Sequence, residues 1–267
     1  MNESLSYEGY ALVFEDRFDG DALDRSKWKV ELHDPGWVNE ELQEYVDAED
    51  VLSLEDGLLY IRPVKTVPAD GGVAYRSGRI STQGKHEFTY GLFEARLRVP
   101  KGRGFLPAFW LMTRDEDRWG QWPVCGEIDI MEVLGHETGT TFGTLHYGLP
   151  HEEDQGRFTL PEGDFAEEFH TFSVEWLPGV IRWYVDGRRF HEARRWFSAG
   201  EEGVRSPYPA PFDHDMYLIL NLAVGGRWPG PPDETTDFSR AAFAADYVRV
   251  YQKKESGGGI LWKRSAL

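Results

Sequence analysis

The chain has 267 residues and a formal net charge of −17, because 46 acidic residues outnumber 29 basic ones. This negative charge repels polyphosphates and anionic lipids, so it argues against nucleic acids and membranes as partners, and mildly against sulfated polysaccharides. The one cysteine, Cys125, excludes an internal disulfide and is expected to be a small buried hydrophobe. A chain of this length can bury a large core as one domain without disulfides or a structural metal.

Short strands are the predicted elements throughout the chain. They are expected, in chain order, at Leu58–Arg62, Ser77–Thr82, Phe93–Val99, Glu127–Val133, Phe142–His146, Phe172–Trp176, Ile181–Asp186, Tyr217–Leu222 and Asp246–Tyr251. In Phe93–Val99, apolar residues alternate with charged ones, and this period of two predicts a strand with one buried face. Ile181–Asp186 alternates in the same way, and Asp186-Gly187 then predicts a hairpin turn into Arg188–His191.

Turn signals separate these strands, and no helix of convincing length is predicted. Loops are expected at Thr66–Gly72, Arg114–Gln121, Pro150–Gly163 and Ser198–His214. Many short strands without helical crossovers predict an all-β sandwich or barrel rather than a parallel α/β fold. This domain is expected to fill residues 1–252, whereas residues 253–267 are predicted to be a flexible Gly-rich tail or linker.

Three acidic residues stand close together in the segment Gly126–Glu132. In a strand, Glu127 and Asp129 point to the same face, whereas Glu132 would point to the other one. A β-bulge with one extra residue at Ile130-Met131 would return Glu132 to the face of the other two. Like charges in such a row must raise at least one pKa. A retaining glycosidase needs this combination, because one carboxylate attacks the sugar while a second, protonated carboxyl donates to the leaving oxygen.

An acidic strand face in solvent and a calcium site are the alternatives for this row. The motif follows Trp119, Trp122 and Pro123 and precedes a predicted strand that contains His146. A solvated face would not be expected among so many aromatic residues, and tryptophan provides a flat platform for neutral ligands. These surroundings favour a binding site over a solvated face.

The segment Trp122–Glu132, with the sequence Trp-Pro-Val-Cys-Gly-Glu-Ile-Asp-Ile-Met-Glu, resembles the bulged active-site motif of glycoside hydrolase family 16, specifically of its laminarinase-like members. The resemblance runs from about Leu12 to Gln252. Further matching segments, in family order, are Asn39–Gln43, Ser77–Ile80, Tyr90-Gly91, Pro107–Trp110, Leu220–Trp228 and Asp246–Tyr251. The resemblance implies a concanavalin-like β-jelly roll, a sandwich of two curved antiparallel sheets with the substrate cleft on the concave face.

By this resemblance, Glu127 is the nucleophile, Asp129 its electrostatic helper and Glu132 the acid/base. His146 matches a family histidine near the acid/base, and a satisfied core imidazole is the alternative. Trp122 matches the family tryptophan that stacks on a sugar beside the cleaved bond, because a flat indole suits the C–H face of a pyranose.

The resemblance also implies further substrate contacts. Trp119 and Trp228 are additional candidates for stacking, whereas Trp110 is expected in the core. Asn39 and Arg79 match residues that hydrogen-bond sugar hydroxyls. The alternatives are a turn residue for Asn39 and a surface cation for Arg79.

Family members often carry a structural Ca²⁺ on the convex face, and oxygen ligands of the kind found there suit calcium. The matching carboxylate is Asp246, and Gly57 matches a carbonyl donor. The usual Asp-Glu-Phe of the family reads Asp16-Arg17-Phe18 here, so Arg17 could contribute only its carbonyl. No cofactor is expected for catalysis.

The resemblance implies a retaining endo-glycosidase that hydrolyses internal β-1,3 bonds of laminarin-like β-glucans, and we expect it to act as a monomer. A mixed-linkage β-1,3-1,4-glucanase is the close alternative. The bulged motif favours the former, because strict mixed-linkage enzymes of the family generally lack the extra residue. A non-catalytic β-glucan-binding protein or a lectin-like module would typically have lost a carboxylate, and all three are present.

The sequence offers two readings of the cellular location. Polymeric glucan lies outside cells, which favours a secreted protein. The segment Met1–Tyr10 is polar and lacks the basic and apolar regions of a signal peptide. A cytoplasmic enzyme for imported oligosaccharides is therefore the alternative.

Overall fold

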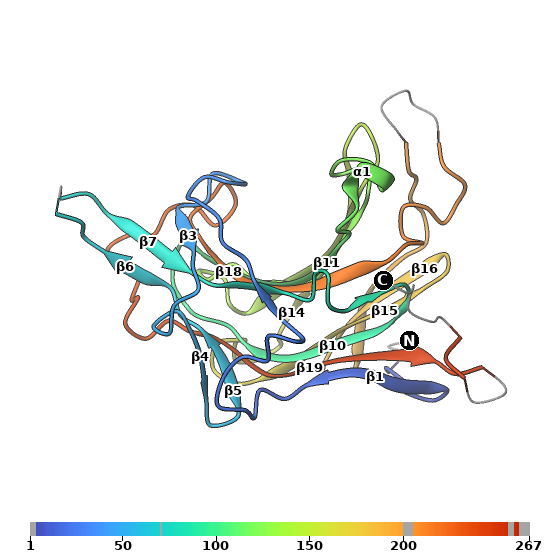
Figure 1. Ribbon diagram of the computed structural model, residues 1–267, viewed down its shortest axis with the longest axis horizontal. Helices are drawn as coiled ribbons and strands as arrows, with labels where there is room; N and C mark the ends of the chain where they lie inside the picture. The colour runs from blue at the N-terminus through green and yellow to red at the C-terminus, as the bar shows by residue number, and fades with distance from the viewer. Residues whose placement is uncertain (1–3, 70, 200–204, 256–258, 262–267) are drawn as a thin grey trace.

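The computed structural model describes residues 4–69, 71–199, 205–255 and 259–261, and these form two large β-sheets packed face to face (Figure 1). Within these residues the helical content is a single short helix, α1 (Glu116–Trp119). The first sheet holds β17 (Arg188–Ala193), β16 (Val180–Val185), β15 (His170–Leu177), β10 (Gly91–Arg98), β19 (Phe243–Lys253), β5 (Leu58–Ile61) and β4 (Leu52–Glu55), with β1 (Tyr10–Asp16) also paired to β19.

The second sheet carries the acidic motif. It holds β14 (Glu152–Thr159), β13 (Thr140–Tyr147), β12 (Glu127–Glu132), β11 (Phe105–Met112), β18 (Met216–Val224), β8 (Arg79–Ser81) and β2 (Lys29–Val30), with β9 (Glu87–Phe88) also paired to β18. A small third sheet of β3 (Gln43–Tyr45), β7 (Ala74–Ser77) and β6 (Val64–Thr66) stands at one side. Figure 1 shows β11 and β18 above β10, β19 and β1, with α1 and the third sheet rising on opposite sides.

The core lies between the two large sheets, because each sheet turns large apolar side chains toward the other. Phe93 and Trp176 from the first sheet and Phe105 and Phe109 from the second are all fully buried in one cluster. Every ladder within these two sheets is antiparallel. The predicted all-β sandwich of two antiparallel sheets is confirmed.

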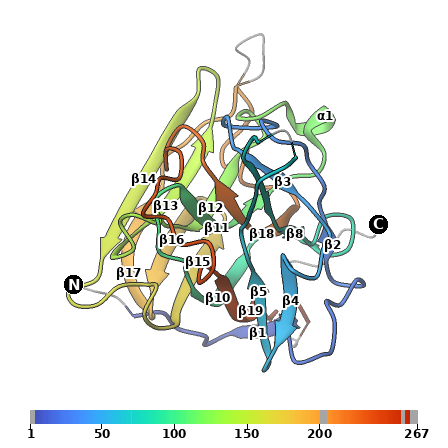
Figure 2. The same cartoon turned by 90° about the vertical axis from the view of Figure 1, so that its left-hand side faces the viewer.

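Each predicted strand overlaps an observed one, and the predicted Asp186-Gly187 turn joins β16 to β17 with positive φ at both residues. Two loop predictions are wrong. Arg114–Gln121 contains α1, and Pro150–Gly163 contains the eight-residue strand β14. β14 lies at the outer edge of its sheet (Figure 2). Its residues are mostly polar and exposed, so its sequence shows no apolar alternation, although it pairs with β13 along its whole length.

The C-terminal segment departs from the predicted linker in its described part. β19 continues to Lys253, and Lys254 forms an isolated bridge with Ile260. Residues 256–258 and 262–267 lie outside the described residues, so a domain boundary after residue 252 stays a prediction. No helix in the described part of the chain is both long and apolar enough to cross a membrane.

Candidate active site

A cleft of about 790 Å³ runs across the outer face of the second sheet and is continuous with a smaller cavity of about 460 Å³. The two cavities share Asn39, Glu41, Leu106, Trp122, Glu127 and Glu132. Lining residues come from β2, β8, β18, β11, β12, β13 and β14, which are neighbours in that order. The cleft therefore extends to both sides of β12, the strand that carries the acidic motif.

A β-bulge places three carboxyl groups on the cleft face of β12. Ladder partners on β11 exist for Asp129, Met131 and Glu132, and the register shift falls at Ile130. Glu127, Asp129 and Glu132 all line the cleft. The predicted bulge and the shared face of the three acids are both confirmed.

The bulged strand is held from behind by the other sheet. Trp183 on β16 is fully buried and donates a hydrogen bond from Nε1 to the backbone carbonyl of Asp129 at 2.7 Å. This bond uses a carbonyl beside the residue that the bulge leaves without a ladder partner. The indole thereby fixes the position of the strand segment that bears the row of acids.

Burial and mutual repulsion keep protons on this row. Burial, followed by the charge of Asp129, raises the pKa of Glu127 from 4.5 to about 8. The charges of His146 and Arg79 and a hydrogen bond from Trp122 lower the pKa of Glu127 again. Burial raises the pKa of Glu132 well above 4.5, and the charges of Asp129, Glu127 and Glu153 raise it further. Among the two glutamates, Glu127 has more neighbours that favour its ionised form.

His146 lies directly across from Glu127 in the β12–β13 ladder. Its Nε2 is 3.2 Å from Asp129 Oδ2 and 3.9 Å from Glu127 Oε1. The predicted position near the acid/base is thus refined, because the nearest carboxylates are those of the other two acids. His146 Nδ1 is hydrogen-bonded to His151 Nε2 at 2.9 Å, and the His151 ring lies 5.0 Å from that of Trp122.

The predicted stacking residues separate into two groups. Trp122 and Trp228 line the cleft and are 45% and 42% exposed, so both offer an open indole face. Trp119 is not among the residues that line the cleft, because its ring stacks on His214 with centroids 4.5 Å apart. Trp110, expected in the core, is partly buried against a small hydrophobic cluster, but it also lines the cleft and donates to Asn221 Oδ1 at 2.7 Å.

Asn39 and Arg79 both line the cleft. Asn39 has a φ of 53° in the loop before β3, so it also has the backbone conformation of a turn residue. Arg79 is buried, and its Nε donates to Glu31 Oε2 at 2.6 Å while its guanidinium lies over the ring of Trp110. The alternative of a surface cation is therefore wrong for Arg79.

The sequence that forms this cleft also matches the pattern of a protein family. The sequence pattern of the family described as glycosyl hydrolases family 16 matches residues 36–240. The chain belongs to glycosyl hydrolases family 16. The family resemblance seen in the sequence is confirmed.

Relatives in family 16 carry related names. A glucan endo-1,3-β-glucosidase of Cryptopygus antarcticus is 34% identical, with 93% of this chain and 94% of the relative covered. The glucan endo-1,3-β-glucosidase A1 of Niallia circulans is 37% identical over 92% of this chain, which spans only 38% of that longer protein. The solved laminarinase catalytic domain of Thermotoga maritima is 39% identical with a TM-score of 0.78, and the match covers 93% of this chain and 100% of that domain.

The calcium site that family 16 implies fits these residues poorly. Asp246 lies on β19, and its Oδ2 accepts a hydrogen bond from Arg96 at 2.6 Å. Gly57 lies in the turn between β4 and β5, and Arg17 is exposed. Asp246 is the only charged donor of the three, and a guanidinium on its carboxylate weakens the attraction for a second cation. Calcium binding stays a prediction.

Sequence reasoning missed several residues of the family 16 cleft, namely Glu31, Trp37, Glu41, His151 and Glu153. Trp37 and Glu41 stand within two positions of Asn39, so the Asn39–Gln43 match was an available signal for both. The segment that contains His151 and Glu153 was predicted to be a loop, and nothing in its pattern indicated that it reaches the cleft.

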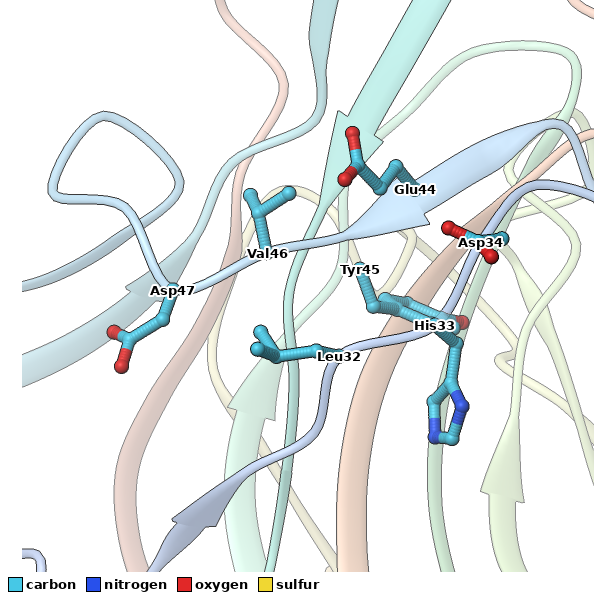
Figure 3. A pocket seen from close by; sticks show the side chains of 7 residues that line it. All are labelled: Leu32, His33, Asp34, Glu44, Tyr45, Val46 and Asp47. Carbon is cyan, nitrogen blue, oxygen red and sulfur yellow. The ribbon is translucent and has the colours of Figure 1, made fainter.

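Figure 3 shows a second recess, of about 350 Å³, which shares His33 with the cleft. It is lined by Leu32, His33 and Asp34 on one side and by Glu44, Tyr45, Val46 and Asp47 on the other. The His33 ring stacks on Trp37 at 3.5 Å, on the cleft side. Tyr45 accepts a hydrogen bond from Asn221 at 3.0 Å, so a residue that lines the recess holds a residue that lines the cleft.

Proposed function

We propose that this chain is a retaining endo-β-1,3-glucanase in which Glu127 is the nucleophile and Glu132 the acid/base. The observation that carries the proposal is the bulged row of Glu127, Asp129 and Glu132 inside an open cleft. A retaining glycosidase needs two carboxyl groups that flank the scissile bond, one ionised and one protonated. The bulge supplies that placement on one strand.

The proposed reaction has two displacement steps. In the first, the Glu127 carboxylate attacks the anomeric carbon while the Glu132 carboxyl gives its proton to the glycosidic oxygen, which leaves as an alcohol. In the second, the Glu132 carboxylate takes a proton from water, and the resulting nucleophile displaces Glu127 from the sugar. Both substitutions invert the anomeric carbon, so the product keeps the β configuration.

The assignment of the two glutamates follows from their neighbours. His146, Arg79 and a hydrogen bond from Trp122 all lower the pKa of Glu127, which favours the ionised form that a nucleophile needs. For Glu132, burial and the charges of the neighbouring acids raise the pKa, and only His146 opposes them. Glu132 therefore keeps its proton more strongly, as a general acid must.

Asp129 is proposed to hold the proton distribution of the row. It is 3% exposed and hydrogen-bonded to Glu127, and its charge raises the pKa of both glutamates. A carboxylate between two others couples their protonation, so that one proton is retained when another is lost.

The shape of the cleft supports cleavage of internal bonds. Lining side chains lie on four strands to one side of β12 and on two strands to the other, so a chain can extend past the row in both directions. Trp122 and Trp228 offer exposed indole faces, which suit the flat C–H faces of neutral sugars. The net charge of −17 disfavours sulfated polymers.

The β-1,3 specificity is supported by the relatives named as glucan endo-1,3-β-glucosidases and by the laminarinase structure. Because polymeric glucan lies outside cells, we propose that the enzyme acts there, as a monomer on single glucan chains.

Product analysis on laminarin, barley mixed-linkage glucan and agarose, side by side, tests the proposal. Rapid release of short oligosaccharides from laminarin with slower attack on barley glucan is the expected result. Preference for barley glucan would keep the mechanism and change the substrate. Binding of laminarin without release of any product would contradict the enzymatic function.

A further inference from the structure

Three ligand atoms converge at the acidic row. The nearest ligand atoms of Glu127, Asp129 and His146 all lie within 4.8 Å of one another. Among the residues that the structure describes, this is the one group of three or more His, Cys, Asp or Glu side chains arranged so closely. The group contains an imidazole as well as two carboxylates, which distinguishes it from an ordinary acidic surface.

One buried oxygen of the group receives no hydrogen bond from the described residues. Asp129 Oδ2 is buried, and no donor in the described part of the chain forms a hydrogen bond to it, although His146 Nε2 lies only 3.2 Å away. A buried carboxylate oxygen without a partner costs free energy. A positively charged group between Oδ2 and Nε2 would remove that cost.

His151 provides the hydrogen-bond partner that a metal-binding histidine usually has on its other ring nitrogen. Histidine ligands almost always use their other ring nitrogen in a hydrogen bond, which fixes the tautomer and the ring orientation. His146 Nδ1 has such a bond, to His151 Nε2 at 2.9 Å. When Nδ1 donates in this bond, Nε2 presents its lone pair toward Asp129 and Glu127.

We propose that Glu127, Asp129 and His146 bind one divalent transition-metal ion, for which Zn²⁺ is the probe, and that the bound ion excludes glucan from the row. Zinc ligands at about 2.0–2.2 Å in a tetrahedron lie roughly 3.3–3.5 Å from one another. The observed separations from His146 Nε2 are 3.2 Å to Asp129 Oδ2 and 3.9 Å to Glu127 Oε1, so small side-chain movements close the site. The fourth position faces the cleft.

The ligand types select the class of metal. Imidazole together with carboxylates suits zinc and its first-row neighbours, whereas calcium takes six to eight oxygen ligands. A zinc ion at this place holds the carboxylate of Glu127 and prevents it from attacking a sugar. Inhibition of hydrolysis rests on the proposed function, but metal binding does not.

Isothermal titration of the full chain with zinc chloride tests the site directly. We expect one equivalent to bind to the wild type, and added laminari-oligosaccharide to weaken that binding. His146→Ala should abolish it. His151→Ala should weaken it about tenfold, as for other partners of metal ligands. His170→Ala is the matched control, because His170 also pairs with a carboxylate, that of Asp186 at 2.7 Å, outside the cleft.

Several results would overturn the proposal. These are no binding to the wild type, unchanged binding in His146→Ala, or loss of binding in His170→Ala. If His146→Ala does not fold, Asp129→Asn replaces it, with loss of zinc binding expected. Magnesium chloride should not bind at this site, and equal binding of both metals would contradict the role of the imidazole. If the protein binds zinc but hydrolyses no glucan, the proposed function alone is rejected. If the protein hydrolyses glucan but zinc neither binds to it nor inhibits the hydrolysis, this inference alone is rejected.

Discussion

Trp183 and Asp129 belong to opposite sheets, and the indole of the first donates a hydrogen bond to the backbone carbonyl of the second at 2.7 Å. The contact ties the bulge in β12 to the core of the sandwich. The geometry of the acidic row therefore depends on a residue that the substrate never touches.

Trp183→Phe removes this hydrogen bond and keeps most of the apolar volume. We expect a loss of about 1–3 kcal/mol in the free energy of unfolding, because a buried carbonyl loses its partner. We also expect a lower kcat with little change in KM, since the row loses its support. Trp28→Phe is the control, because Trp28 is also fully buried and donates from Nε1 to Asp16 Oδ2 at 2.8 Å, at the end of β1 in the first sheet. Equal losses of kcat in both variants would contradict a specific role of Trp183.

Glu127→Ala is expected to abolish hydrolysis, because the attacking carboxylate is lost. Added azide should restore turnover of a substrate with a good leaving group and give the α-glycosyl azide, since the anion takes the place of the nucleophile. Glu132→Ala with azide should give the β-glycosyl azide. Product anomers identified by NMR check both results, and the reverse pattern would mean that the two roles are exchanged.

The pH profile of kcat/KM should move in Asp129→Asn. The charge of Asp129 raises the pKa of both Glu127 and Glu132. The acidic limb follows ionisation of Glu127, and the alkaline limb follows loss of the proton from Glu132. Removal of the charge lowers both pKa values, so both limbs should shift to lower pH. A profile that keeps its limbs while kcat falls would limit Asp129 to a structural role.

The stability of Glu127→Gln relative to the wild type should increase with rising pH. Burial raises the pKa of Glu127 from 4.5 to about 8 in the folded protein. The unfolded chain releases this proton near pH 4.5, so stability present below that pH is lost progressively up to about pH 8. Melting temperatures should match the wild type below pH 4.5, exceed it increasingly toward pH 8, and keep a constant difference above. A difference independent of pH would argue against a buried, proton-holding Glu127.

Trp228→Ala should raise KM for laminarin about two- to tenfold, which corresponds to the roughly 0.5–1.5 kcal/mol of an aromatic contact. The indole is exposed, lines the cleft and packs on Phe142. Trp119→Ala is the matched control and should leave KM unchanged, because Trp119 stacks on His214 instead. A larger effect in Trp119→Ala would show that substrate extends beyond the cleft.

The sequence predicted the sandwich and the bulge because both have local patterns. The bulge followed from three acids, of which Glu132 would otherwise face away from Glu127 and Asp129. β11 shows what such patterns leave open. Its residues are apolar on both faces, one toward the core and one toward the cleft, so periodicity could not assign Trp110 to either.

Long-range partners were also invisible in the sequence. From the sequence, Arg79 was as compatible with a surface cation as with a buried residue of the cleft, because its partner Glu31 lies 48 positions earlier in the chain. β14 lacks apolar alternation, since it is an edge strand whose residues are mostly polar and exposed. The His146–His151 contact spans the turn between β13 and β14, and no residue pattern indicates it.

Because β14 is an edge strand and most of its side chains are exposed, many of them can be replaced at little cost to the packing of the domain. Glu153 and Gln155 line the cleft from this strand, and His151 does so from the turn just before it. Evolution can therefore change which glucans or ions this wall accepts while the acids on β12 stay fixed. The edge strand that tolerates change and the strand that carries the acids lie only two strands apart.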